Sequence, residues 1–166
     1  MQITVRPART EEFDDVGKLT LAGYQADGYL TGDEDYAGEL LDAASRAAGA
    51  ELLVAIDAQT GDLLGTVTFV LPGSPYAEIS RPGEAEMRML SVGPAVRRAG
   101  VGRTLVRSCI DRAEAAGARV MVLSTTHLMV GAHALYERMG FTRLPERDWQ
   151  PAPHIRLLAY ALPLNR

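Results

Sequence analysis

The sequence predicts a single α/β domain, residues 1–166, with a central mixed β-sheet flanked by about four helices. The length and a composition of 47% hydrophobic and 23% charged residues suit one domain with a sizeable core. Strand-like and helix-like periodicities alternate along the chain. The nearly continuous apolar run at residues 120–124 follows an alternating strand at 86–92 across a helical pattern, so a right-handed βαβ unit with parallel strands is expected.

The N-terminal half has the pattern of a strand, two helices and an antiparallel pair of strands. Residues 3–6 form a short strand that Pro7 stops, and Thr10 is placed to cap a first amphipathic helix. The acidic residues 33–35 open a second helix, which continues to residue 48 and ends at Gly49. Residues 52–56 and 63–71 are then expected to pair as antiparallel strands, because residues 57–62 have the composition of a hairpin turn.

The C-terminal half begins with a loop at residues 72–83, rich in Pro, Gly and Ser. A loop of this length fits a flap that faces a substrate, and it equally fits an inert surface loop. The strand at 86–92 ends at Gly93-Pro94, and the helix that follows ends at Gly117. A short helix at 131–139 and further strands, one starting at Phe141 and one at 155–161, complete the sheet.

An arginine-glycine loop joins the 86–92 strand to the next helix. It reads Arg-Arg-Ala-Gly-Val-Gly-Arg-Thr over residues 97–104. Glycines let a backbone approach a ligand closely, and the first amides of a helix have no partner within the helix. Together with the arginines, these groups are typical of a phosphate-binding site.

Two common phosphate-binding loops do not fit this spacing. A Walker A loop needs a lysine after its last glycine, and the only lysine of the chain, Lys18, lies far away in the N-terminal part. The dinucleotide fingerprint needs a third glycine where this chain has Leu105.

The remaining pattern, a strand, Pro94, Arg97, Gly100 and Gly102 in register, resembles the acyl-coenzyme A pyrophosphate loop of the GCN5-related N-acetyltransferases, the GNAT family. Residues 132–141, Ala-His-Ala-Leu-Tyr-Glu-Arg-Met-Gly-Phe, resemble a second stretch typical of that family. The resemblance covers nearly the whole chain, although the first 80 residues match mainly in the order of elements. It implies parallel, splayed central strands and direct transfer of an acetyl group from acetyl-coenzyme A to a primary amine within a ternary complex.

The resemblance also implies which residues contact the cosubstrate. Many family members have Asn seven residues before the motif tyrosine, where this chain has Met129. Either Ser124, Thr125 or Thr126 supplies that contact instead, or the contact is absent. The residues expected to bind acetyl-coenzyme A are Leu90, Ser91, Val92, Arg97, Arg98, Ala99, Gly100, Val101, Gly102, Arg103, Thr104, Ser124, Thr125, Ala132 and Tyr136.

Two residues are the candidates for acid–base chemistry. An alkylamine with a pKa near 10.4 is protonated at pH 7, so a general base is useful, and the family often has one on the central strand, where Glu86 lies. Alternation puts Glu86 and Arg88 on one face, so the two side chains could instead form an ion pair. Tyr136 is at the position of the family tyrosine that donates a proton to the leaving thiolate, and the alternative is a packed ring beside Leu135.

The charge distribution predicts a cationic acceptor, which is either a small molecule or a peptide. Residues 1–80 contain 4 Lys or Arg against 14 Asp or Glu, whereas residues 81–166 contain 13 against 7. The basic half holds the anion-binding loop, so the acidic half is free to attract an ammonium group, and aromatic faces would assist. The acids at 33–35 could equally be solvated residues at a helix start. The candidate acceptor residues are Tyr24, Asp27, Tyr29 and Arg88.

Other functions fit less well. The net charge of −4 argues against nucleic acid, and no apolar run reaches the roughly 20 residues that span a bilayer. The N-terminus lacks a signal-peptide pattern, so a cytoplasmic protein is expected, as a monomer or homodimer. The three histidines do not have the spacing of a metal site. The lone Cys109 is expected to be a small buried residue. Trp149 is expected either in the acceptor cleft or in the core. A non-catalytic module that binds acyl-coenzyme A is the alternative function.

Overall fold

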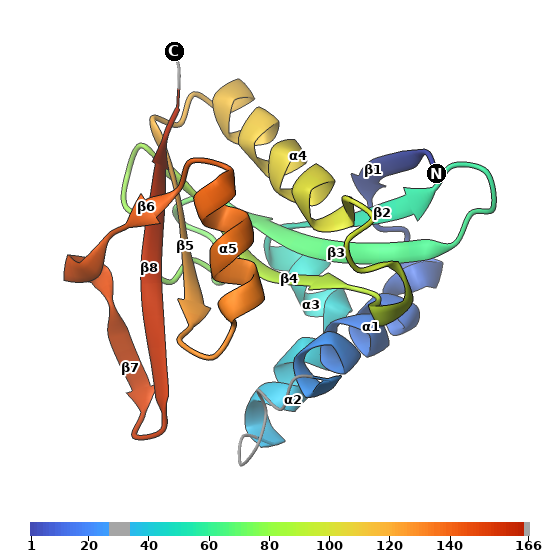
Figure 1. Cartoon of the computed structure of the whole chain (residues 1–166), viewed down its shortest axis with the longest axis horizontal. Helices are drawn as coiled ribbons and strands as arrows, with labels where there is room; N and C mark the ends of the chain where they lie inside the picture. Colours follow the sequence, from blue (N-terminus) through green and yellow to red (C-terminus); the bar gives the residue numbers. More distant parts are fainter. Residues whose placement is uncertain (27–33, 165–166) are drawn as a thin grey trace.

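The computed structural model describes residues 1–26 and 34–164, in which helices cover both faces of a mixed sheet (Figure 1). The helices are α1 (Phe13–Ala26), α2 (Glu34–Leu41), α3 (Ala43–Gly49), α4 (Val101–Ala115) and α5 (Val130–Arg138), with short 3₁₀ turns η1 (Thr10–Glu12), η2 (Pro94–Val96) and η3 (Pro145–Arg147). The strands are β1 (Ile3–Pro7), β2 (Glu51–Asp57), β3 (Leu63–Val70), β4 (Glu84–Val92), β5 (Val120–Thr126), β6 (Thr142–Arg143), β7 (Trp149–Ala152) and β8 (Ile155–Pro163).

The described strands form one sheet in the order β1-β2-β3-β4-β5-β8-β6, with β7 paired to β8. Neighbours from β1 to β4 are antiparallel, β4 and β5 are parallel, and β5 and β8 are antiparallel. The predicted mixed sheet with a parallel central pair is therefore confirmed.

The two central strands separate halfway along their length. Pairing between β4 and β5 runs from Glu84 opposite Val120 to Met87 opposite Leu123, whereas β5 continues to pair with β8 as far as Thr126. The last residues of β4 therefore diverge from β5, as the resemblance implied. This opening lies beside the arginine-glycine loop and α5.

Helices α4 and α5 pack on one face of the sheet, and α1, α2 and α3 pack on the other (Figure 1). The main core cluster holds the apolar stripe of α4, including Leu105 and Cys109, against side chains of β2 to β5. Cys109 is fully buried, which confirms its interpretation as a small core residue, and burial raises the pKa of its thiol to about 12. Two smaller clusters lie beneath α1, α2 and α3.

The single helix predicted between residues 33 and 48 is wrong, because two helices occupy this stretch. Asp42 separates α2 from α3 and caps the second, since its Oδ1 accepts the N–H of Ser45 at 3.1 Å. An aspartate side chain competes for backbone donors and so favours a helix start over a helix interior. The described residues consequently hold five helices, and they also include β7, which the sequence did not predict.

Strand β4 contains a bulge at the point where it leaves β5. Arg88 lies opposite Thr68 and Ser91 lies opposite Thr66, so two residues of β4 oppose Val67 alone. Met89, one of these two, has φ +55, an uncommon value for a non-glycine residue. Met89 consequently packs with Tyr24 of α1 rather than on the α4 face of the sheet.

No helix in residues 1–26 or 34–164 is both long enough and apolar enough to cross a bilayer.

Candidate active site

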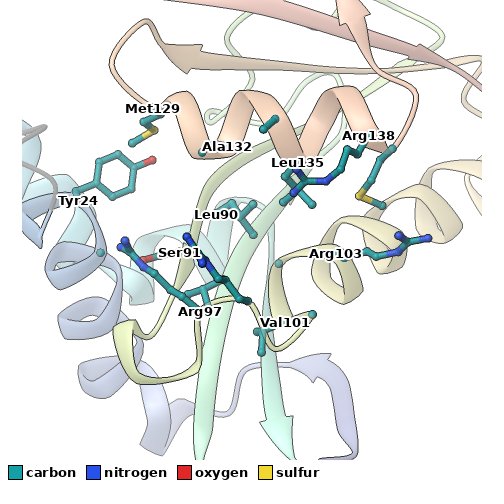
Figure 2. Close-up of a pocket in the computed structure, with 18 residues that line it drawn as sticks. Tyr24, Leu90, Ser91, Arg97, Val101, Arg103, Met129, Ala132, Leu135 and Arg138 are labelled. Carbon is teal, nitrogen blue, oxygen red and sulfur yellow. The ribbon is translucent and has the colours of Figure 1, made fainter.

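A cavity of about 870 Å³ lies where the end of β4, the arginine-glycine loop, the start of α4 and one side of α5 meet (Figure 2). Ten of the residues predicted to contact the cosubstrate line it: Leu90, Ser91, Val92, Arg97, Arg98, Gly100, Val101, Gly102, Arg103 and Ala132. The sequence pattern of a strand, a loop and a helix start therefore predicted residues that line one wall of a large cavity.

The backbone of the loop depends on glycine at one position. Gly100 has φ +86 and caps α4, and its carbonyl accepts both the N–H of Thr104 at 3.0 Å and the Thr104 hydroxyl at 2.8 Å. A side chain is strained at this φ value, although a Cβ on Gly100 would meet no atom within 4 Å. A Cβ on Gly102 would lie 3.2 Å from the Leu135 side chain. Both positions thus leave the start of α4 open to the cavity.

The charge of this cavity suits a polyanion. Arg97, Arg98 and Arg103 come from the loop and α4, and Arg138 reaches the same space from α5 (Figure 2). Among the described residues that line the cavity, none is acidic. Guanidinium groups and the amides at a helix N-terminus both favour phosphate, so these residues fit the pyrophosphate of acetyl-coenzyme A.

The sequence missed part of this wall. One face of α5 contributes Gly131, Ala134, Leu135 and Arg138. Their spacing of three to four residues marks a single helix face and could have predicted this part of the wall. Gly23 and Tyr24 of α1 also line the cavity, as do Met129 and Met139. Five predicted contacts do not line this cavity. Ala99 and Thr104 line neither cavity, and Ser124, Thr125 and Tyr136 line a second one.

The second cavity, of about 490 Å³, is lined by residues of both β4 and β5. It shares Tyr24, Leu90, Met129 and Ala132 with the first, so the two spaces meet at the splayed strands. Its remaining walls come from α2, the loop between β3 and β4, β4, β5, α5 and the β7–β8 hairpin.

Tyr136 lies on α5 at this second cavity. The ring packs against those of Phe141 and Tyr160, with centroids 5.8 Å and 6.2 Å away, and the residue is 6% exposed. Burial raises the pKa of its hydroxyl, so this group keeps its proton throughout the neutral range. The hydroxyl is therefore available as a hydrogen-bond donor at neutral pH.

Glu86, the predicted base, is fully buried on β4 and lies outside the described lining of both cavities. Its carboxylate accepts the backbone N–H groups of Glu78 at 3.0 Å, Ile79 at 3.3 Å and Ser80 at 3.1 Å. The alternative interpretation, an ion pair with Arg88, is corrected by the structure: the guanidinium of Arg88 lies 3.1 Å from the carboxylate of Glu78. This contact was missed because it needs the loop to fold back over β4.

The candidate acceptor residues fall into two groups. Tyr24 and Arg88 both line the second cavity, whereas Asp27 and Tyr29 lie outside the described residues. Tyr24 packs edge-on against Tyr36 of α2, with ring centroids 6.0 Å apart. Trp149 also lines this cavity, and its Nε1 donates to the Ser124 hydroxyl at 3.4 Å. It is exposed and does not lie in the core.

Met129, at the position of the family asparagine, lies where the two cavities meet. The hydroxyl of Thr125 contacts its sulfur at 3.7 Å. In residues 1–26 and 34–164, no group of three His, Cys, Asp or Glu side chains is arranged to hold a metal ion.

Comparison with known proteins decides the family. The profile of the acetyltransferase (GNAT) family matches residues 15–141, more than half of the chain. The chain belongs to the GNAT family.

This GNAT protein is similar in sequence to mammalian members of N-acetyltransferase family 8. It is 41% identical over 86 residues to member 3 of Rattus norvegicus and 38% identical over 63 residues to member 7 of Mus musculus. These matches cover 52% and 38% of this chain. They span 36% of the rat protein and 28% of the mouse protein, so they concern only a part of those proteins.

Solved GNAT structures share the fold over almost the whole chain. A GNAT acetyltransferase of Staphylococcus aureus Mu50 superposes with a TM-score of 0.76 at 15% identity, covering 99% of this chain and 100% of that one. An acetyltransferase from Salmonella typhimurium, solved with its cofactor acetyl-CoA, superposes with a TM-score of 0.67 at 21% identity and covers 100% and 96% of the two chains.

Proposed function

We propose that this GNAT protein transfers the acetyl group of acetyl-coenzyme A to a primary amine by direct attack in a ternary complex. The observation that carries the proposal is the meeting of two cavities at the splayed strands. One has a basic, glycine-lined wall and the other has a mixed wall of aromatic, apolar and charged residues. Two reactants bound from opposite sides would meet at the shared residues, where proximity lowers the entropic cost of reaction.

In this proposal the first cavity holds the cosubstrate. Acetyl-coenzyme A supplies an activated acetyl group as a thioester. The arginine-glycine loop and the start of α4 bind its phosphates, while Leu90, Ser91 and Val92 at the end of β4 border the same cavity. Ala132 and Leu135 of α5 form the opposite wall.

Tyr136 acts as the proton donor to the departing sulfur. Tyr136 lies one helical turn after Ala132, which lines both cavities, and its hydroxyl is protonated at neutral pH. Both observations support this role. The sequence predicted Glu86 as the base. Because its carboxylate is fully buried and accepts three backbone N–H groups, its contacts favour a role in holding the loop at residues 78–80.

The acceptor is a small-molecule or peptide amine with a positive charge and an apolar body. The second cavity combines the carboxylates of Glu39 and Glu78 with the single guanidinium of Arg88, so acids outnumber arginines and lysines among its described lining residues. Tyr24, Tyr36 and Trp149 add aromatic faces, which attract ammonium groups. The acids at 33–35 do not enter this argument, because residue 33 and the side chains of 34 and 35 lie outside the described part.

Release of free thiol from acetyl-coenzyme A tests the function. The purified protein is mixed with a panel of amines, namely tyramine, spermidine, lysine amide and glutamate, and the products are identified by mass spectrometry. Acetylated product with a preference for the cationic amines over glutamate is expected. Binding of coenzyme A without any thiol release across the panel would instead identify a non-catalytic acyl-coenzyme A module.

A cytoplasmic location and a monomeric or homodimeric state stay predictions. Light scattering on the purified chain measures the second directly.

A further inference from the structure

The loop between β3 and β4 is fastened to the protein at several points. The Ser74 hydroxyl donates to the carbonyl of Gly49 at 2.6 Å, and Arg88 donates to the carbonyl of Tyr76 at 3.0 Å. Arg147 donates to the carbonyl of Ile79 at 3.1 Å while also pairing with Glu84. These contacts give the loop a fixed path over β4, which favours the substrate-facing flap over an inert surface loop.

The fully buried Glu86 carboxylate makes the strongest of these attachments. A charged group without exposed surface is costly unless hydrogen bonds compensate it, and three consecutive backbone N–H groups, those of residues 78–80, do so here. The same contacts determine where the backbone of Glu78 lies. Glu86 thus positions a second carboxylate.

The side chain of Glu78 lines the second cavity, together with Tyr136. It is 24% exposed, and its Oε2 lies 3.1 Å from Nη2 of Arg88. Among the contacts of the described residues, Oε1 of Glu78 has no hydrogen-bond donor. One oxygen is therefore oriented by Arg88, and the other is left to accept a proton or a hydrogen bond.

Several charged and titratable groups surround Glu78. Burial raises the pKa of this carboxyl, Arg88 of β4 opposes the increase, and the negative charges of Glu86 and of Glu39 on α2 add to it. Tyr36 of α2 and Tyr24 of α1 line the same cavity, as do Tyr136 and His154. A carboxylate with a raised pKa is a stronger base than an exposed one, so these surroundings favour proton acceptance.

We propose that Glu78 binds the ammonium group of the acceptor and removes one of its protons, and that Glu86 and Arg88 are positioning residues for Glu78. The inference rests on the acetyltransferase function proposed above. One N–H bond of the ammonium breaks, its electron pair stays on nitrogen as the attacking lone pair, and the proton bonds to Oε1 of Glu78. Glu78 becomes a neutral carboxylic acid and the amine becomes a neutral nucleophile. The proton is later lost to solvent, which restores the carboxylate.

The test compares Glu78→Gln with wild type on the amine that wild type acetylates fastest in the panel. At pH 7 we expect kcat/KM to fall by about 10²- to 10³-fold, with unchanged affinity for coenzyme A in calorimetry. The deficit should shrink as the pH approaches 10, because the free amine then loses its proton without help. Calorimetry of the coenzyme A complex should also show weaker binding of tyramine, but not of its uncharged analogue 4-ethylphenol.

Glu51→Gln is the matched control, since it removes a carboxylate that pairs with Arg112 at 3.1 Å on β2, outside both cavities. It should leave the kcat/KM and the pH profile unchanged. For Glu86→Gln we expect a lower melting temperature and lower kcat/KM, and the double variant Glu78→Gln/Glu86→Gln should lose little more activity than Glu78→Gln alone. That non-additivity would not arise from a merely structural effect.

The two proposals fail in different ways. If wild type releases no thiol with any amine, the acetyltransferase function fails, and the role of Glu78 fails with it. If wild type is active and Glu78→Gln keeps its kcat/KM and pH profile, only the role of Glu78 is overturned.

Discussion

A negative charge at Gly100 should abolish cosubstrate binding while the protein stays folded. Gly100 has φ +86 at the start of α4, and a Cβ there would meet no atom within 4 Å. Gly100→Asp therefore adds no steric clash inside the protein. Its cost to folding is the left-handed backbone conformation, about 1–2 kcal/mol for an L-residue, which lowers the melting temperature by roughly 2–8 °C in a chain of this size.

The cost to binding is separate and electrostatic. The new carboxylate would lie on the order of 5 Å from one phosphate charge. At an effective dielectric constant of about 20, their repulsion weakens the binding free energy by about 3 kcal/mol, which is roughly 10²-fold in affinity. Coenzyme A carries more than one such charge, so calorimetry should find a loss of at least this size.

Gly61→Asp is the control for this experiment. Gly61 has φ +82 in the hairpin turn between β2 and β3, again with no atom within 4 Å of an added Cβ. It should show the same drop in melting temperature and wild-type affinity for coenzyme A. Equal, undiminished affinity in both variants would refute the assignment of the arginine-glycine loop as the phosphate site.

Three further outcomes follow from single side chains. Tyr136→Phe should lower kcat by about 10²- to 10⁴-fold without weakening coenzyme A binding, and an unchanged kcat in single-turnover kinetics would contradict its role as the acid. Cys109, fully buried with a pKa raised to about 12, should react with a thiol reagent only after denaturant unfolds the protein, so fast labelling of the native state would contradict its burial. The Arg6 hydrogen bond lowers the pKa of Glu12 to about 2, so this partly exposed pair should stabilise the fold by about 1 kcal/mol above pH 4.5 and lose this contribution as the pH falls toward 2. Urea titrations of wild type and Glu12→Gln check this, because the gap between them should narrow in acid.

One wall of the first cavity could be predicted from the sequence, because its residues lie close together in the chain. The signal is a strand that ends before Pro94, followed closely by two glycines and three arginines. Because a helix begins directly after them, these residues gather in one small region. The apolar stripe of α4 was readable for the same reason, because a helix repeats its buried face every three to four residues. These features need no knowledge of how distant segments pack.

The pairing of charges could not be read in this way. Strand alternation correctly suggested that Glu86 and Arg88 share a face, but the partner of each depends on a loop that folds back over β4. Backbone N–H groups are present at every residue except proline, so nothing in the sequence marks those of Glu78, Ile79 and Ser80 as the ones that bind Glu86.

The sequence by itself determined the family, the order of most elements and the basic wall of the first cavity, because each is encoded in short contiguous patterns. Only the tertiary structure revealed the second cavity. The second cavity is assembled from α1, α2, the β3–β4 loop, β4, β5, α5 and the β7–β8 hairpin, which are far apart along the chain. The bulge at Met89, a residue that packs with Tyr24 of α1, likewise depends on pairing with β3. Contacts of this kind follow from packing and strand register, which a linear pattern of residues does not specify.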